Sequence, residues 1–265
     1  MIHIATTHFR DTGWIDLQLR HLERHTKEPY LTYASLEQID ARQRSRFDWT
    51  MDHTGRIPSR KPGVLGPGLE ACLNELAGEI IRRADPGDLL VFMHSDALPI
   101  ADWVAPSRRT LAEVPLAAIR RDENYEPVPH WSFCVTTAGF WSEVGDWSRG
   151  PTWDDGLRRA SDTGALLWQR LERRGIAWHP LLRTNKVDLH PVLFGVYGDL
   201  VYHHGTGSRT PMTRRDARGY AHLAAPLRKV AGVRRRIANT RLSRRMLRKI
   251  RRDERFYLEL TGGPV

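Results

Sequence analysis

The chain has 265 residues, of which 40% are hydrophobic and 27% are charged, and this fits one large globular domain or one domain with an appendage. The formal net charge is +10, but residues 226–255 alone hold 13 basic and 2 acidic residues. The remainder of the chain holds 28 basic and 29 acidic residues and is therefore nearly neutral, which argues against a nucleic-acid-binding body. Two distant cysteines exclude a disulfide framework, and the lack of a basic leader, an apolar signal core and a bilayer-length apolar run predicts a cytoplasmic protein.

The first third of the chain alternates between strand-like and helix-like patterns. Residues 2–6 and 29–36 predict strands, and a helical spacing of apolar residues begins between them at Trp14. Residues 42–67 are polar and broken by Gly and Pro, which predicts a loop. A clear apolar helical face then follows at 69–81.

A continuous apolar run, Leu89–Met93, follows the turn at Asp85–Asp88. Such a run is typical of a central parallel strand that is covered on both faces. The resulting β-α-β-α-β order predicts a doubly wound α/β sheet, in which ligands bind beyond the carboxyl ends of the strands. Asp96 lies just beyond such an end.

The second half contains shorter patterns. We expect a loop rich in Trp, Gly and Asp at 140–160, a helix at 163–174, and strands at 116–119, 132–137, 176–181 and 192–202. From residue 221 onward the pattern predicts a mainly helical tail with an irregularity at Asn239-Thr240.

Three segments carry residues suited to phosphate or metal chemistry. Asp96 suits a metal–diphosphate complex, although an aspartate in this place also caps turns. Residues 202–209 end a strand with His203 and His204, which point to opposite faces, so at most one is expected as a metal ligand. Asp162 precedes a helix and is either its N-cap or a base that faces the cleft.

These segments, in this order, resemble family 2-type glycosyltransferases over roughly residues 1–210. Phe92–Asp96 is similar to the strand that ends in the family's Asp-x-Asp metal motif, with His94 in the first position. Gly139–Glu143 resembles the family's acceptor-side Gly-Phe-Asp-Glu element. Ser161-Asp162 and the helix after it resemble the Glu-Asp-x-x-Leu-x-x-Arg block, and His203–Ser208 resembles the closing His-x-x-Gly-x-Ser element.

The resemblance implies a GT-A fold, an α/β single Rossmann-type domain with a central, mostly parallel sheet. We place this domain at residues 1–220 and a basic amphipathic helical tail at 221–265. The implied activity is inverting transfer of a sugar from a nucleoside diphosphate sugar to an acceptor hydroxyl, in surface polysaccharide or glycolipid assembly. The implied cofactor is Mn²⁺ or Mg²⁺, held by Asp96 with His203 or His204. Asp162 stands in the place of the catalytic base, with Asp154 and Asp155 in reserve.

Further contacts to the nucleotide sugar are expected along the same edge. Thr6 and Thr7 end the first strand, and Glu37 follows the second, where it can accept a hydrogen bond from a base or ribose. The other expected donor-binding residues are Ser95 with Asp96, Arg60 and Lys61 before a helix N-terminus, and Ser208 and Arg209 after the last strand.

The tail combines apolar and basic residues. From Leu227 to Ile250 apolar residues recur every three or four positions, with almost only Arg and Lys between them. Such a helix either binds an anionic membrane surface, near lipid-linked acceptors, or packs on the domain by its apolar stripe. The sequence leaves both arrangements open.

Two other functions fit part of the pattern. A nucleic-acid-binding protein would fit the basic tail, but the tail has no interleaved aromatic residues. Sugar-1-phosphate nucleotidyltransferases share a Rossmann-like body but resemble one another in a basic, glycine-rich loop directly after the first strand. Thr6–Asp11 has no glycine run, which disfavours that activity.

Overall fold

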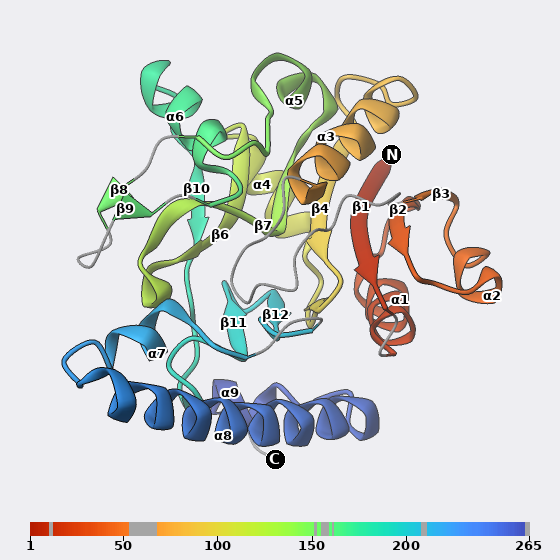
Figure 1. Ribbon diagram of the computed structural model, residues 1–265. Helices are drawn as coiled ribbons and strands as arrows, with labels where there is room; N and C mark the ends of the chain where they lie inside the picture. The colour runs from red at the N-terminus through yellow and green to blue at the C-terminus, as the bar shows by residue number, and fades with distance from the viewer. Residues whose placement is uncertain are drawn as a thin grey trace.

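The computed structural model describes residues 1–10, 13–52, 68–150, 153–154, 159–160, 162–207 and 211–262, without the side chains of 153, 154, 159, 160, 214 and 217. Its centre is a seven-stranded sheet in the order β10-β6-β7-β4-β1-β2-β3 (Figure 1). The strands are β1 (Ile2–Phe9), β2 (Tyr30–Glu37), β3 (Trp49–Asp52), β4 (Leu89–His94), β6 (Leu116–Arg121), β7 (Glu126–Thr137) and β10 (His179–Leu181). Only β7 is antiparallel to its neighbours. The expected α/β fold with a mostly parallel sheet is confirmed.

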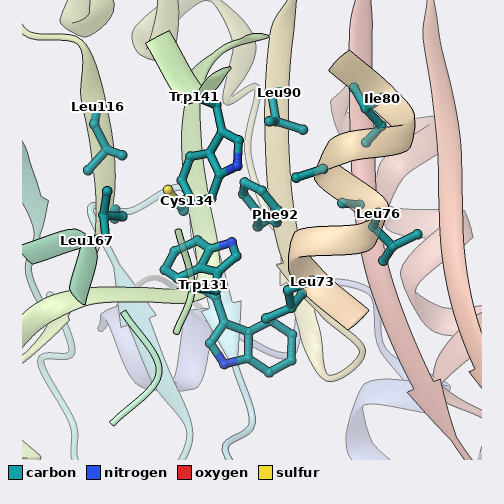
Figure 2. Packing of buried hydrophobic residues seen from close by; sticks show 14 of the residues in the cluster. Leu73, Leu76, Ile80, Leu90, Phe92, Leu116, Trp131, Cys134, Trp141 and Leu167 are labelled. Carbon is teal, nitrogen blue, oxygen red and sulfur yellow. The ribbon is translucent and has the colours of Figure 1, made fainter. Parts of the chain in front are cut away.

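Helices cover both faces of this sheet: α1 (Trp14–His25), α3 (Gly68–Ile81), α4 (Val104–Leu111), α5 (Ala138–Val144) and α6 (Ala165–Arg173). The apolar run of β4 explains why, because alternate side chains point to opposite faces. Leu90 and Phe92 pack with α3, α5 and α6, whereas Val91 and Met93 pack with α1 and α4. Figure 2 shows Phe92 between the tryptophans of one side and the leucines of α3.

The strand order fixes where a ligand can bind. Reading from the edge, β3-β2-β1-β4 is the 3-2-1-4 order of a doubly wound sheet, whose direction of winding reverses between β1 and β4. Crossover helices leave an open crevice at the carboxyl ends of such strands. Thr7, two residues before the end of β1, pairs with His94, the last residue of β4, so both residues lie near this edge.

A second, three-stranded sheet continues from this edge, in the order β11-β12-β5. Its strands are β5 (Ala97–Pro99), β11 (Gly195–Tyr197) and β12 (Val201–His203). The expected single strand at 192–202 is therefore wrong, because the chain reverses at Gly198 and Asp199, both of which have positive φ. Leu200 N donates to Tyr197 O across this turn. The turn matters for the site, because it returns β12 to pair with β5.

Several short elements interrupt the expected loops. The segment predicted as a loop at 42–67 begins with the end of α2 (Ala41–Arg44) and contains β3, which pairs with β2. The remaining short elements are η1 (Asp122–Asn124), β8 (Trp153–Asp154) and β9 (Arg159–Ala160). Each is stabilised by a partner elsewhere in the chain or by one local turn, rather than by a long apolar pattern.

The C-terminal tail contains α7 (Arg214–Arg218), α8 (Ala225–Arg252) and α9 (Leu258–Thr261). The expected irregularity at Asn239-Thr240 is wrong, since α8 is continuous through both residues. The Asn239 side chain is buried and donates to Pro211 O at 2.7 Å and to Asp216 Oδ2 at 3.1 Å. A tertiary contact of this kind allows a poor helix former inside a helix.

Candidate active site

The turn after β4 holds a fully buried carboxylate. Ser95 and Asp96 form the tight turn into β5, and the Asp96 side chain is 0% exposed. Its Oδ1 contacts His94 Nδ1 and lies 3.4 Å from His203 Nε2, while Gly207 N donates to Oδ2 at 2.7 Å. The pairing of Ala97 with His203 in the small sheet brings these two segments together.

His94, Asp96 and His203 form a group that fits a metal ion. One ligand atom from each residue lies within 4.8 Å of the other two. Two imidazoles and one carboxylate are the donors that divalent transition metals accept. His94 is the most accessible of the three, and its ring meets Trp131 edge-on at 4.3 Å between centroids. Trp131, on β7, therefore helps to orient the His94 ring.

The electrostatics of this group match the protonation state that a metal site requires. Burial raises the pKa of Asp96, but His94 and His203 outweigh it and hold the pKa well below its ordinary value of 3.8. Burial lowers the pKa of His203 to about 4, although Asp96 opposes the shift. At neutral pH the carboxyl group is therefore ionised and the His203 imidazole is neutral.

His204 belongs to a different environment. Its Nδ1 is 2.8 Å from Tyr202 Oη and its Nε2 is 2.8 Å from Ser243 Oγ on α8, so protein groups engage both ring nitrogens. The ring also packs against Trp14 and Phe194. The structure thus places His203 beside Asp96 and turns the side chain of His204 toward the tail, as expected for adjacent strand residues.

The buried histidines predict a loss of stability in acid. Burial lowers the pKa of His203 and of His204 to about 4 from 6.5, so between these values the unfolded chain binds protons that the folded chain excludes. The free energy of unfolding should therefore fall as pH drops, by about 2 kcal/mol per histidine between pH 7 and pH 5. Urea unfolding at both pH values measures it. In His204→Gln part of the pH dependence should vanish, and an unchanged dependence would contradict this assignment.

A second group lies next to the first. Glu126, His130 and Asp162 each place one ligand atom within 4.8 Å of the others, and Arg121 forms an ion pair with Glu126 and lies 3.7 Å from Asp162. Because a guanidinium already compensates these carboxylates, the group is better suited to positioning than to binding a cation. The His130 ring lies 5.9 Å from the His203 ring, centroid to centroid, and so links the two groups.

Asp162 is not the N-cap of the following helix. α6 begins at Ala165 with Gly164 as its N-cap, in the left-handed region at φ 96°. Asp162 Oδ1 accepts a hydrogen bond from Thr163 N at 2.8 Å, and the other carboxylate oxygen faces Arg121. The side chain is mostly buried, with 13% exposed. Asp162 therefore lies with Arg121, Glu126 and His130, and its expected role as a base stays a prediction.

The end of β1 supports the site rather than opening into it. Thr6 Oγ1 donates to Gln18 Oε1 at 3.1 Å and lies 3.3 Å from His8 Nε2. Gln18 Nε2 in turn donates to His94 O at 2.7 Å and to Ala97 O at 3.1 Å. Gln18 thus fastens both sides of the Asp96 turn. Thr7 points to the other face of β1.

Glu37, at the end of β2, has the properties of a ligand-binding carboxylate. Its Oε2 is buried and has no hydrogen-bond partner among the described residues. Burial raises the pKa of Glu37, and Arg10 partly opposes the shift. A buried acceptor without a partner is costly unless a bound group satisfies it.

The other expected contacts fall on parts of the chain without a structural description. Arg60, Lys61, Ser208 and Arg209 lie outside the described residues, as does the reserve base Asp155. Asp154 lies in β8, but its side chain is not described.

The expected acceptor-side element lies elsewhere. Gly139–Glu143 forms part of α5, and Gly139 N donates to Pro86 O, just before β4 begins. Thr137, the N-cap of α5, pairs with Leu89 at the start of β4. This element therefore begins at the edge of the sheet opposite Asp96, and Trp141 is part of the core. Its local sequence resembles a motif, but the direction of β7 carries it away from the site.

Several residues of the site were not singled out from the sequence, namely Gln18, Arg121, Glu126 and His130. One signal was present. Glu126, Val128, His130 and Ser132 are spaced by two residues and so point to one face of a strand, which places polar groups in an otherwise apolar segment. The β6–β7 register shifts beside His130, as at many functional sites.

No family model and no curated protein matches this sequence. Among solved structures, the chain is similar to the WbbM bifunctional glycosyltransferase, at 10% identity and a TM-score of 0.41, over 68% of this chain and 38% of that one. It is also similar to galactosyltransferase LgtC in complex with donor and acceptor sugar analogues, at 11% identity and a TM-score of 0.41, over 67% of this chain and 73% of that one. A third similar structure is S. aureus TarS 1–349, at 10% identity and a TM-score of 0.40, over 70% of this chain and 58% of that one. The chain thus spans well under half of the length of WbbM. Similarities at this level do not establish a function, so any function has to be argued from the geometry of the site.

Proposed function

We propose that this chain is a metal-assisted glycosyltransferase that moves a sugar from a nucleoside diphosphate sugar to an acceptor hydroxyl. The observation that carries the proposal is the group of His94, Asp96 and His203, which lies at the carboxyl end of β4. This is the place where a doubly wound sheet binds nucleotides, at its switch point between β1 and β4. A carboxylate–imidazole group there suits a diphosphate and its cation.

The three residues would hold the metal ion, which when bound would neutralise the diphosphate leaving group. Two imidazoles make the donor set softer than the all-oxygen sets that Mg²⁺ prefers, so we propose Mn²⁺ as the better fit. Gly207 N and the Gln18 side chain fix the Asp96 turn from two sides. The chain's own contribution is thus to pre-organise the place of the leaving group.

The nucleoside would lie across the ends of β1 and β2. Glu37 offers its buried Oε2 as acceptor to a base N–H or a ribose hydroxyl, and Thr7 lines the same edge beside His94. Thr6 acts through Gln18 instead, because its hydroxyl group already donates within the protein. The basic residues expected at the phosphates, Arg60, Lys61 and Arg209, remain part of the proposal.

Asp162 is proposed as the base that removes the proton of the acceptor hydroxyl. It lies next to His130, which separates it from His203 and the metal-binding group. A base on one side of the sugar and the leaving group on the other would give inversion at the anomeric carbon. The acceptor proposed is a growing surface polysaccharide or glycolipid.

Nucleotide binding tests the proposal directly. The full chain should gain stability with one of UDP, GDP, dTDP or CDP in the presence of Mn²⁺, because a ligand that binds only the folded state stabilises it. At a hundred times the dissociation constant the gain is about 2.7 kcal/mol, or roughly 5–10 °C in Tm. Differential scanning fluorimetry with and without Mn²⁺ measures it.

Two further measurements complete this test, namely analysis of the reaction products and circular dichroism of the same protein. Release of nucleoside diphosphate, rather than pyrophosphate, from the matching sugar nucleotide separates sugar transfer from nucleotidyl transfer. A chain that is folded by circular dichroism yet shows no shift with any of the four nucleotides would overturn the proposal.

A further inference from the structure

Helix α8 has two apolar faces that serve different purposes. Met246 and Ile250 are buried against α1, β11, β12 and α9, together with Phe256 and Leu260. Leu227, Val230, Val233 and Ile237 are exposed by 61%, 57%, 47% and 48%. At about 100° per residue these two sets point in roughly opposite directions. The stripe that the sequence presents as continuous is therefore split between a packed and a free face.

The free face, which we call the outer face of α8, is apolar in its first half and basic in its second. The apolar half, Leu227 to Ile237, is about 15 Å long. Arg241, Arg244 and Arg248 follow on the same face, and Arg234 lies within the apolar half; all four are exposed, and none forms an ion pair with a described residue. The 28 residues of α8 contain no acidic side chain. Figure 1 shows α8 along the bottom of the molecule, below β11 and β12.

We propose that the outer face of α8 binds the surface of an anionic lipid bilayer, with its apolar half among the acyl chains nearest the headgroups and its arginines on lipid phosphates. An amphipathic helix that lies in the interface needs both an aliphatic face and flanking cations, and this face supplies both. None of the described helices has both the length and the apolar character needed to cross a bilayer.

The composition of this face argues against two other partners. A nucleic acid would satisfy the arginines but would leave four exposed aliphatic side chains without an apolar partner, and α8 offers no aromatic ring for base stacking. A second copy of the chain could cover the aliphatic residues, but it would bring two acid-free, arginine-rich helices together. Like charges at that distance oppose such a dimer.

The packed face would set the orientation of the protein on the membrane. Ser243 on α8 contacts His204 Nε2 at 2.8 Å and Thr206 Oγ1 at 3.1 Å, one residue from His203 and from Gly207 respectively. Arg235 and Asn239 also bind Asp216. The helix is therefore fixed to the segment that carries the candidate metal site. A bilayer under α8 would lie at a set distance from that site, where a lipid-borne acceptor could reach it.

Vesicle flotation of the full chain tests this inference without any substrate, so its result is independent of the proposed sugar transfer. The probes are vesicles of phosphatidylcholine alone and of phosphatidylcholine with phosphatidylglycerol at about three to one. The unmodified protein should float with the anionic vesicles only, and added salt should weaken the binding. Val230→Gln/Val233→Gln, and separately Arg241→Gln/Arg244→Gln/Arg248→Gln, should each lower the floated fraction at least about tenfold.

The matched control is Leu182→Gln/Val187→Gln, because these residues are 43% and 45% exposed but lie outside α8. This variant should float like the unmodified protein. Equal flotation of all four proteins, or none with anionic vesicles, would overturn the proposal. So would light scattering that shows a dimer abolished by Val230→Gln/Val233→Gln, or saturable binding to single-stranded RNA without vesicle binding.

Discussion

Asp96→Asn is expected to lower sugar transfer by on the order of a thousandfold and to abolish the Mn²⁺-dependent gain in Tm with nucleotide. The substitution keeps the shape of a side chain that is completely buried and leaves an oxygen to accept from Gly207 N. It removes the negative charge that His94 and His203 face. The physical reason for the loss is thus the charge of the metal-binding group, and not the geometry of the turn.

Asp88→Asn is the matched control. Asp88 lies directly before β4, whereas Asp96 lies directly after it, and Asp88 pairs with the N-terminal amine and with His3. The same chemical change at the other end of the strand should leave transfer within about twofold, because Asp88 lies away from the carboxyl ends of the strands where ligands bind. The assays are initial rates with the matching sugar nucleotide and thermal unfolding. If Asp96→Asn transfers sugar as fast as the unmodified protein, Asp96 has no part in the reaction.

The central sheet could be predicted because its strands are continuous apolar runs. Leu89–Met93 is buried on both faces, so it needs no alternation and no partner to be recognised. β3 could not be predicted in the same way, since its four residues are at most partly buried and do not form an apolar run, and they pair with the edge that β2 offers. The hairpin of β11 and β12 is hard to predict although Gly198-Asp199 favours a turn, because apolar residues surround this pair on both sides.

The site shows the same division between local and distant information. The place of Asp96 follows from the end of one strand, which is a local pattern. The neighbour of Asp96 does not follow from a local pattern: only the family resemblance offered His203 or His204, and His203 reaches Asp96 through the pairing of two three-residue strands that are far apart in the chain. Gln18 and His130 belong to the same class, since a helix and an antiparallel strand bring them to the edge. Helix α8 is a further example, because its periodic apolar residues divide between a packed face and an exposed face, and the sequence does not show this division.

Asp162→Asn is expected to lower kcat by about a hundred- to ten-thousandfold while nucleotide binding stays unchanged. General bases contribute rate enhancements of this size, and removal of a base leaves the ground-state complex intact. Asp162 is set apart from the metal-binding group by His130, so the nucleotide and Mn²⁺ should still raise Tm. The measurements are kcat, KM and the nucleotide-dependent shift for each variant.

Two variants separate a base from a merely structural carboxylate. Asp122→Asn removes an exposed carboxylate paired with Arg120 near the same strands, and should leave kcat unchanged. Glu126→Gln removes the other partner of Arg121 and should lower stability, because it leaves a buried guanidinium with one counterion fewer. If Asp162→Asn lowers stability as Glu126→Gln does but keeps full kcat, Asp162 only compensates Arg121. A loss of kcat in Asp154→Asn or Asp155→Asn would then assign the role of base to that residue.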